Sequence, residues 1–380
     1  MKDRVLVFNG YYFPAKKYGG PATSIENMVE ACSDALEFFI IVVNHDFGTT
    51  EKFTSIREGW NERGKAKVLY VDDDQFTVNN ISAWIDEIKP ASIYLGGVLS
   101  IRNISYVMAA RRKKVKIIVP PRGEVLDNAV KRKQFKKLAF FTFLRLFDVY
   151  KHCYFHATSE AERNGVMKYL GVSADHIILL PNIPKQVMDG HIIEKTVGTL
   201  NAVYIARICK TKNLLEAISS LSHVKGHVHY RIYGPMEDEQ YWSECEAAMK
   251  AVPPTVKIEY MGALDSNYVG DVYRQSDCTI LPTVTENYGH SIAESLVAGC
   301  PCIIPQGTTP WDSIDLQAGF TYPLGNEIRL AEIIQKMVDM DQKEYSELIQ
   351  STYAYARERI SSVSLIKDYE NMFGNQGETF

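Results

Sequence analysis

Cysteine is scarce in this sequence, and it occurs in none of the patterns that indicate a metal site or a disulfide framework. The seven cysteines are scattered and odd in number, and no two of them form a CxxC pair. Free thiols in a reducing compartment are the simplest interpretation, which predicts a cytoplasmic protein. The histidines, including the group His223, His227 and His229, show no metal-ligand spacing either. We therefore expect no bound metal.

A strong excess of charge is also missing. The formal net charge is -4, which gives no indication of a nucleic-acid partner. The chain contains no short-period repeat and no low-complexity tract. Its first residues, MKDRVLVFNG, turn polar after one short apolar run, so that we expect neither a signal peptide nor a membrane span there.

Length and composition predict two soluble globular domains. A chain of 380 residues is too long for one core, and 46% hydrophobic with 23% charged residues is ordinary for a globular protein. Apolar runs alternate with helical periodicity in both halves of the chain. The expected strands are 5–8, 38–43, 68–71, 92–95, 116–119 and 153–157, then 202–206, 228–233, 256–260, 278–281 and 302–305.

This alternation predicts an α/β fold of two Rossmann-like, doubly wound parallel sheets, each covered by helices on both faces. Pro181-Asn182-Ile183-Pro184 breaks the pattern, and the polar stretch 185–198 is typical of a linker. We assign 1–185 to an N-terminal domain, 198–360 to a C-terminal domain, and 361–380 to a C-terminal helix that packs back on the first domain. Two such domains favour a ligand in an interdomain cleft, at the carboxyl ends of the strands.

The most informative stretch is 282–305, PTVTENYGHSIAESLVAGCPCIIP. It predicts a polar loop of Glu286, Asn287, Tyr288 and Gly289, a short helix over 291–298 and a further strand. Unpaired N–H groups and the dipole at a helix N-terminus favour an anion. At this helix start the backbone N–H of His290 should matter more than its imidazole.

Two glutamates bracket this helix start, with seven residues between Glu286 and Glu294. A carboxylate beside a phosphate would repel it, so we expect these side chains to accept hydroxyl hydrogens from a sugar or a ribose instead. The alternative is an ordinary helix with surface glutamates.

The residues Glu286, Gly289 and Glu294, followed by Ala298-Gly299-Cys300-Pro301, resemble the glutamate-x7-glutamate signature of the retaining glycosyltransferases of family 4. Thr309-Pro310-Trp311 resembles the segment that follows this motif in bacterial members that build surface polysaccharides. The resemblance implies the two-domain GT-B fold. It also implies metal-independent, retaining transfer from a nucleotide-diphosphate sugar to a glycan or lipid-linked oligosaccharide, without a further cofactor.

In this family the N-terminal domain takes the acceptor side and the C-terminal domain binds the nucleotide sugar. Glu286 would then hold sugar hydroxyls and Glu294 the ribose. Arg207 and Lys212 follow the expected strand 202–206, and two cations at the carboxyl end of a strand suit a diphosphate. The alternative is a solvated basic loop, since Lys210 lies between them. The family carries an arginine and a lysine at this spacing, which implies a catalytic set of Glu286, Arg207 and Lys212.

Glycines in other loops extend the expected donor site. Gly19 and Gly20 precede the first helix, where glycine allows close backbone approach to a phosphate, although a plain turn is the alternative. Gly234 ends the strand 228–233 and resembles the family's loop there. Met261 follows the strand 256–260, where family members hold the nucleobase through backbone groups. The expected donor-binding residues are Gly19, Gly20, Arg207, Lys212, Gly234, Met261, Glu286, Asn287, Tyr288, Gly289, His290 and Glu294.

The segment Pro121-Arg122-Gly123 ends the strand 116–119 and resembles a PRG element of bacterial members, on the N-domain side of the cleft. Arg122 could meet either the donor phosphate or the acceptor, and the role of Glu124 is open. We assign Arg122, Gly123 and Glu124 to the acceptor side.

Two further segments each leave two interpretations open. Asp72-Asp73-Asp74 formally fits the DxD metal motif of the other glycosyltransferase fold, but an acidic triplet after a strand is usually a solvated loop. The basic run 131–137, KRKQFKK, leads into LAFFTFLRLF. Cations beside an aromatic-rich helix fit a peripheral contact at the inner face of the cytoplasmic membrane. Alternatively, the helix faces the core and has a basic outer face.

Two other functions compete with glycosyl transfer. A nucleotide-sugar 2-epimerase shares the GT-B architecture, but it needs acid and base carboxylates at the sugar and no acceptor. A non-catalytic nucleotide-sugar-binding protein is the second alternative. The intact set of Glu286, Glu294, Arg207 and Lys212 argues against it, because a decayed site should have lost some of these residues.

Overall fold

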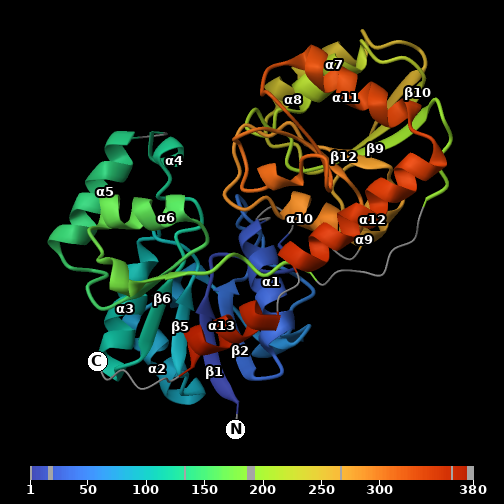
Figure 1. Cartoon of the computed structure of the whole chain (residues 1–380). Coiled ribbons are helices and arrows are strands. Elements are labelled where there is room, and N and C mark those ends of the chain that lie inside the picture. Colours follow the sequence, from blue (N-terminus) through green and yellow to red (C-terminus); the bar gives the residue numbers. More distant parts are fainter. Residues whose placement is uncertain are drawn as a thin grey trace. The chain divides into compact units, whose positions relative to one another are not determined.

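The computed structural model describes residues 2–15, 20–131, 134–185, 193–265, 268–360 and 363–374. The chain forms two compact units (Figure 1). The first unit consists of Met1–Ile183 together with Val363–Phe380, and the second consists of Pro184–Ser362. Residues 186–192 of the stretch expected to be a linker lie outside the described residues.

The first unit is built on an eight-stranded sheet within the described residues, in the order β3-β4-β2-β1-β5-β6-β7-β8. All neighbours pair in parallel except β3 and β4. The strands are β1 (Asp3–Phe8), β2 (Leu36–Val43), β3 (Trp60–Arg63), β4 (Ala66–Val71), β5 (Ser92–Leu95), β6 (Lys116–Val119), β7 (Tyr154–Ala157) and β8 (Ile177–Leu179). The strand order reverses at β1, which has β2 on one side and β5 on the other.

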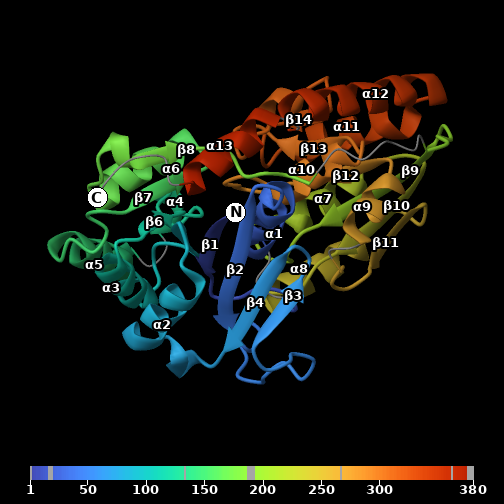
Figure 2. The same ribbon diagram turned by 90° about the horizontal axis from the view of Figure 1, so that it is seen from below.

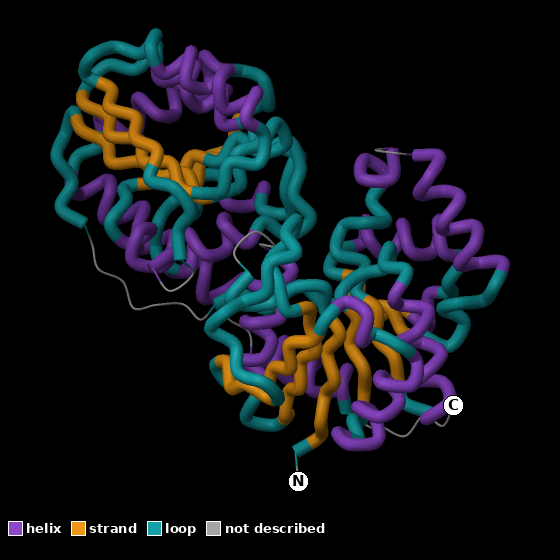
Figure 3. Tube along the Cα trace, turned by 180° about the vertical axis from the view of Figure 1, so that it is seen from behind, coloured by secondary structure: helices purple, strands orange, loops and turns teal. Residues whose placement is uncertain are grey.

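Helices cover both faces of this sheet (Figure 3). They are α1 (Gly20–Cys32), α2 (Val78–Ile88), α3 (Arg102–Lys113), α4 (Asp127–Lys131), α5 (Gln134–Leu146), α6 (Glu160–Gly165) and α13 (Val363–Phe373). Successive side chains of a strand point to opposite faces. Accordingly, Leu6 of β1 belongs to the core beneath α2 and α3, whereas Val5 belongs to the core shared with α1 and α13.

The second unit repeats this plan with six strands in its described part, all parallel, in the order β11-β10-β9-β12-β13-β14. The strands are β9 (Thr199–Ile205), β10 (His227–Tyr233), β11 (Val256–Tyr260), β12 (Cys278–Ile280), β13 (Cys302–Pro305) and β14 (Gly319–Tyr322). The helices are α7 (Leu214–Leu221), α8 (Glu239–Met249), α9 (Val269–Arg274), α10 (His290–Val297), α11 (Glu327–Asp339) and α12 (Gln342–Arg359). Both units therefore have the doubly wound α/β fold that the sequence predicts.

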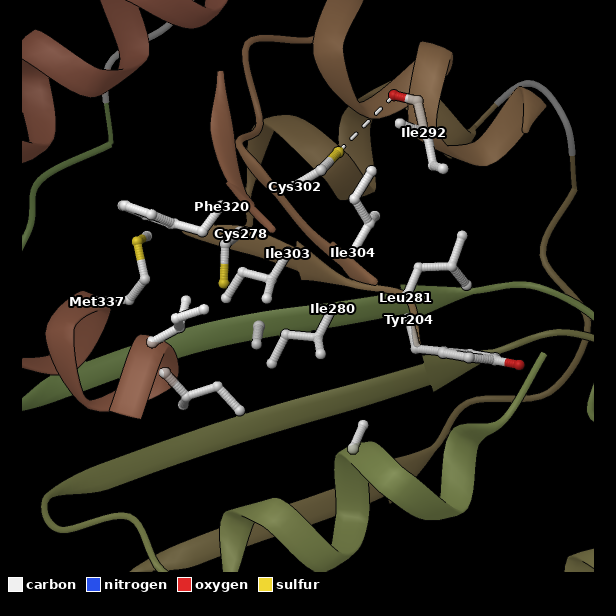
Figure 4. Close-up of a cluster of buried hydrophobic side chains, with 14 of the residues drawn as sticks. Tyr204, Cys278, Ile280, Leu281, Ile292, Cys302, Ile303, Ile304, Phe320 and Met337 are labelled. Atoms are coloured by element: carbon white, nitrogen blue, oxygen red, sulfur yellow. Dashed lines mark hydrogen bonds between the residues drawn. The ribbon is translucent and has the colours of Figure 1, made fainter. Parts of the chain in front are cut away.

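One buried cluster anchors α10, the helix of the glutamate motif, on this second sheet (Figure 4). The backbone carbonyl oxygen of Ile292 in α10 points toward Cys302 of β13, whose sulfur lies 3.8 Å from it. The side chains of Ile292, Cys302 and Phe320 are all buried. The N-terminus of α10 is thus held against the sheet by packing along the helix.

The last described helix, α13, belongs to the first unit and crosses its sheet (Figure 2). Phe373 is fully buried, and its ring centroid lies 6.0 Å from that of Phe38 and 5.5 Å from that of Tyr94. The hydroxyl of Tyr369 donates to the carbonyl of Pro181, at a distance of 3.0 Å. The helix therefore covers the first core and also contacts the end of the segment that leads into the second unit.

His156 of β7 joins these parts of the first unit. It is fully buried, and its Nδ1 lies 2.8 Å from the hydroxyl of Tyr94. Its Nε2 lies 3.0 Å from the carbonyl oxygen of Leu180 and 3.2 Å from the hydroxyl of Tyr369. Burial lowers the pKa of His156 from 6.5 to about 4, against the raising effect of the Leu180 carbonyl, and the charge of Arg122 lowers it further.

We predict that the buried, neutral imidazole of His156 makes the first unit less stable at acidic pH. The folded state keeps the imidazole neutral down to about pH 4, whereas the unfolded chain takes up a proton near pH 6.5. The unfolded state binds more protons in this window, so stability falls as the pH falls from 6.5 to 4, by up to about 3 kcal/mol. Urea unfolding at several pH values should show a shallower pH dependence for His156→Gln. The exposed His152→Gln is the control and should follow the parent; equal slopes for all three proteins would contradict the prediction.

Candidate active site

The loops that follow β9, β10, β11 and β12 lie at one edge of the second sheet, because parallel strands end on the same side. Backbone hydrogen bonds tie them together. The N–H of Ile208 donates to the Pro235 carbonyl at 2.9 Å, and the N–H of Val284 donates to the Thr211 carbonyl at 2.9 Å. The structure therefore brings the expected residues Arg207, Lys212, Gly234, Met261 and Glu286 to one edge of the sheet, on neighbouring loops.

The centre of this edge is an ion pair between Lys212 and Glu286. The ammonium of Lys212 donates to Oε1 of Glu286. Only 16% of the lysine side chain and 12% of the glutamate side chain are exposed. A charge in such a position is costly unless a partner compensates it, so the two side chains hold each other in place. The N–H of Glu286 donates to the Thr308 carbonyl at 2.7 Å, which also fixes the backbone.

Arg207 forms a second, more exposed pair, with Glu237 of the loop after β10. Its Nη1 lies 2.7 Å and 2.8 Å from the two carboxylate oxygens of Glu237. About half of each side chain is exposed. A phosphate offers an arginine the same kind of oxygen pair as a carboxylate does. The guanidinium is therefore held where it can bind an oxyanion. The sequence analysis did not predict a role for Glu237. Its position three residues after Gly234, in a loop at the same sheet edge, was the only indication of such a role.

Gly289 is the N-cap residue of α10 and has a left-handed conformation, with φ of +79°. A Cβ at this position would lie 3.0 Å from Cδ1 of Ile292 and 3.3 Å from Nε1 of Trp311. The indole N–H of Trp311 donates to the Tyr288 carbonyl, and the two rings lie 5.5 Å apart. Trp311 thus fixes the loop that leads into the N-terminus of α10. Its own role was not foreseen from the sequence.

Glu294 lies one turn into α10 and is half-buried, as are Asn287 and His290. Burial raises the pKa of Tyr288, and the charge of Glu294 raises it further. Burial and then the same carboxylate raise the pKa of Tyr273 as well. The Glu294 carboxylate therefore lies near two buried phenols rather than in open solvent.

Gly234 permits the closest backbone approach at this edge. Its φ is +144°, and a Cβ there would lie 1.9 Å from the Ala206 carbonyl oxygen, so no other residue fits. The hydroxyl of Tyr260 donates to the Gly234 carbonyl at 3.0 Å. In the loop after β11, the N–H of Met261 donates to the Ile232 carbonyl at 2.8 Å. The Met261 residue is 48% exposed.

The expected glycine pair of the first unit is only partly described. Gly19 lies outside the described residues. Gly20 is the exposed first residue of α1, and its carbonyl accepts a hydrogen bond from the Ser24 hydroxyl at 3.0 Å.

Arg122 and Gly123 both have left-handed backbones, with φ of +49° and +77°. The N–H of Gly123 donates to the buried carboxylate of Glu162, which also accepts from the N–H and the hydroxyl of Thr158 at 2.8 Å and 2.7 Å. Glu162 thus ties the loop after β6 to the loop after β7. The guanidinium carbon of Arg122 lies 5.8 Å from the Tyr94 ring centroid.

Glu124 is held by the neighbouring loop after β5. Its carboxylate accepts from the N–H groups of Val98 and Leu99 at 2.7 Å and 3.0 Å. Burial raises the pKa of Glu124 although both hydrogen bonds lower it. Arg122, Gly123 and Glu124 therefore lie together on the carboxyl edge of the first sheet.

Two members of the acidic triplet pair with basic side chains in the structure. Asp72 pairs with Lys52 at 2.7 Å, and Asp73 pairs with both His45, at 2.8 Å, and Arg102. Within the described part of the chain, no group of three or more His, Cys, Asp or Glu side chains is arranged to hold a metal ion.

Residues 193–357 match the model of a protein family described as "Glycosyl transferases group 1". The matched range spans nearly all of the second unit. A search of curated proteins gave no match. Within the described residues, no helix combines the length and the apolar character that a membrane span requires.

Solved structures similar to the whole chain share its fold at low sequence identity. HepE of Anabaena, determined with UDP and glucose, has a TM-score of 0.74 and 12% identity, covering 97% of this chain and 99% of that chain. Sucrose-phosphate synthase of Thermosynechococcus elongatus has a TM-score of 0.71 and 11% identity, covering 98% of both chains. TarM of S. aureus has a TM-score of 0.69 and 11% identity, covering 98% and 99%.

The fold is therefore GT-B, as the resemblance implied. Together with the family match over residues 193–357, this fold supports a glycosyltransferase.

We predict that Gly289→Ala destabilises the second unit more than Gly325→Ala does. Both glycines have a left-handed φ, at +79° and +81°. An L-residue pays roughly 1–2 kcal/mol in that conformation. A Cβ at Gly325 meets nothing within 4 Å, whereas at Gly289 it crowds Ile292 and Trp311. Urea unfolding should show a loss near this range for Gly325→Ala and a larger loss for Gly289→Ala. Equal losses of unfolding free energy would contradict the prediction, because they would show that the loop before α10 accommodates the added Cβ without loss of stability.

Proposed function

We propose that this protein is a retaining, metal-independent glycosyltransferase that moves a sugar from a nucleotide-diphosphate sugar to a glycan or lipid-linked acceptor in polysaccharide biosynthesis. The observation that carries the proposal is the nearly buried Lys212–Glu286 pair beside the N-terminus of α10. It puts a cation, a carboxylate and an anion-favouring helix end on neighbouring loops of one sheet edge.

Charge decides the role of each group. The diphosphate gains negative charge as its bond to the sugar breaks, so Lys212, Arg207 and the N-terminus of α10 stabilise the transition state more than the bound donor. Glu286, held by Lys212, has a second oxygen for a sugar hydroxyl. Glu294, deeper in α10, accepts the ribose hydroxyls.

The anomeric configuration is retained if the acceptor attacks the same face of the sugar from which the leaving group departs. The departing diphosphate oxygen then takes the proton of the acceptor hydroxyl, and no protein nucleophile is needed. The two cations do the work that a metal ion performs at other phosphate sites, since they neutralise the same oxygens. Arg122, Gly123 and Glu124 are the proposed acceptor-side group of the first unit.

The structures of HepE and TarM were determined with UDP. UDP-sugars are therefore the first donors to test, before GDP- and ADP-sugars. Seven free cysteines and a nucleotide-sugar donor are consistent with a reaction on the cytoplasmic side of the membrane.

A membrane contact fits the surface of α5. Three exposed apolar side chains of α5 and the residue that follows the helix form a group that we call the α5 stripe: Phe135, Phe143, Leu146 and Phe147 are 91%, 37%, 77% and 67% exposed. Phe141 and Leu144 on the other side are buried in the core. The helix thus faces the core, as one interpretation of the sequence had it, and its outer face carries the α5 stripe together with the exposed cations Lys136 and Arg145. Residues 132 and 133 of the basic run lie outside the described residues.

We predict that one class of nucleotide sugar stabilises the protein and is turned over only with an acceptor, in the presence of EDTA. A ligand at a hundred times its Kd adds about 2.7 kcal/mol to the free energy of unfolding, which a melting curve detects. Sugar transfer and the anomeric configuration of the product are followed by NMR. Conversion of the sugar without acceptor would indicate an epimerase, and loss of activity in EDTA that manganese restores would contradict metal independence.

We predict that Arg207→Ala and Lys212→Ala reduce turnover more than donor affinity. Each removed contact should cost about 2.7–4 kcal/mol of barrier, a factor of roughly 100 to 1,000 in kcat, by analogy with the loss of an oxyanion donor. Glu294→Ala should instead weaken donor binding, because ribose geometry barely changes during transfer. The exposed Lys210→Ala on the same loop is the control. Normal kcat at saturating donor in the Arg207 and Lys212 variants would refute their leaving-group role.

A further inference from the structure

A cavity of about 390 Å³ lies in the first unit at the C-terminal end of α5. Leu144 and Arg145 of the helix line it, and so do Lys151 of the following loop, Leu170 and His176. The α5 stripe continues directly from this wall, because Leu146 and Phe147 follow Arg145 in the chain. The cavity and the exposed apolar surface are therefore neighbours.

The charged groups of the cavity favour an anion. Arg145, Lys151 and His176 line it against one carboxylate, Asp148. Lys151 lies 3.8 Å from Asp148, and His176 lies 3.3 Å from Asp175 outside the lining. Among the lining residues the charges of Lys151 and Asp148 offset each other, which leaves the positive charge of Arg145.

Arg145 is the least compensated of these cations. A Cβ on Gly171 would lie 3.1 Å from its Nε, so its guanidinium rests over that glycine at the cavity wall. Its side chain makes no hydrogen bond or ion pair with any residue that the structure describes, and it is exposed. Its donors are thus available to a ligand.

The sequence of α5 adds to this pattern. Between Gln134 and Leu146 the helix carries Lys136, Lys137 and Arg145 and no acidic residue. A helix with an apolar outer face and only cationic charges suits the interface of an anionic bilayer, where the apolar side chains enter the acyl boundary and the cations remain among the phosphates. The cavity opens at the end of this helix.

We propose that the cavity binds the phosphodiester headgroup of an anionic phospholipid while the α5 stripe inserts into the same leaflet. The proposal rests on the membrane contact proposed above, and it makes that contact specific: one lipid is held at a site, in addition to the general attraction between the basic surface and the membrane. Arg145 and Lys151 hold the phosphate oxygens, and the apolar wall of Leu144 and Leu170 faces the glycerol and the first acyl carbons.

The test compares full-length variants in two assays. Arg145→Gln removes the proposed phosphate contact, and Arg112→Gln removes an exposed arginine of α3 as a charge-matched control. Leu146→Ser shortens the stripe, and Ile328→Ser, at a residue of α11 that is 54% exposed, is its matched control. Co-sedimentation uses vesicles of phosphatidylcholine with and without phosphatidylglycerol. Thermal stabilisation uses a short-chain phosphatidylglycerol below its micelle concentration, and inorganic phosphate at the same concentration.

We expect the parent and both controls to bind the vesicles that contain phosphatidylglycerol. Arg145→Gln should bind them at least about fivefold more weakly, the factor for about 1 kcal/mol per cation near the surface, and the short-chain lipid should no longer stabilise it. Leu146→Ser should lose vesicle binding but keep the stabilisation by the short-chain lipid.

Three results would overturn the headgroup site. Equal vesicle binding by Arg145→Gln and Arg112→Gln, with loss only in Leu146→Ser, would leave a membrane contact without a lipid site. Stabilisation by inorganic phosphate equal to that by the lipid would identify a general phosphate site. Absence of vesicle binding in the parent would refute the membrane contact as well, whereas glycosyl transfer to a soluble acceptor would still be measured independently.

Discussion

The geometry of the second unit's site depends on the ion pair between Lys212 and Glu286. The two residues come from the loops after β9 and β12, which are neighbouring strands, and little of either side chain is exposed. Removal of one partner would leave the other as an uncompensated charge in a mostly buried place. The backbone bond from Val284 to Thr211 sets the same two loops against each other. Cation and carboxylate are therefore positioned as one unit, and neither can be treated as an independent binding group.

The groups around this pair differ in how much water they contact, and this difference assigns their chemistry. Arg207 is about half exposed and pairs with Glu237, which is equally exposed, so an incoming phosphate can exchange with that carboxylate at small cost. The N-terminus of α10 is fixed by contrast, because Trp311 holds the Tyr288 carbonyl and Ile292 is packed in the core. In the proposed reaction, a rigid helix end and a rigid lysine, with one exchangeable arginine, would provide preorganised stabilisation for the charge that develops on the diphosphate.

The strands with continuous apolar runs were predictable from the sequence. A strand that is buried on both faces needs apolar residues throughout, and this pattern can be recognised without knowing which strand lies beside it. The strands β3, β8 and β14 were not foreseen. Trp60-Asn61-Glu62-Arg63 is polar and forms β3 only by pairing with β4, while β8 and β14 are short. In the site, spacing indicated Glu286 and Glu294, but it could not indicate Glu237, whose contact with Arg207 spans 30 positions. Pairings of that kind depend on which loops the sheet order brings together.

The helix α5 shows why composition alone left its role open. Its apolar residues occur around most of the helix, a pattern that normally indicates complete burial. In the structure only one side reaches the core, because the neighbouring segments cover Phe141 and Leu144 and leave Phe135 and Leu146 outside. Exposed aromatic and aliphatic side chains in this number are unfavourable in water. A protein partner with a basic surface would not cover them well, because the flanking cations would repel it. An anionic leaflet satisfies both requirements at once. In the proposed function, such a contact would also hold the acceptor side of the enzyme next to a lipid-linked substrate.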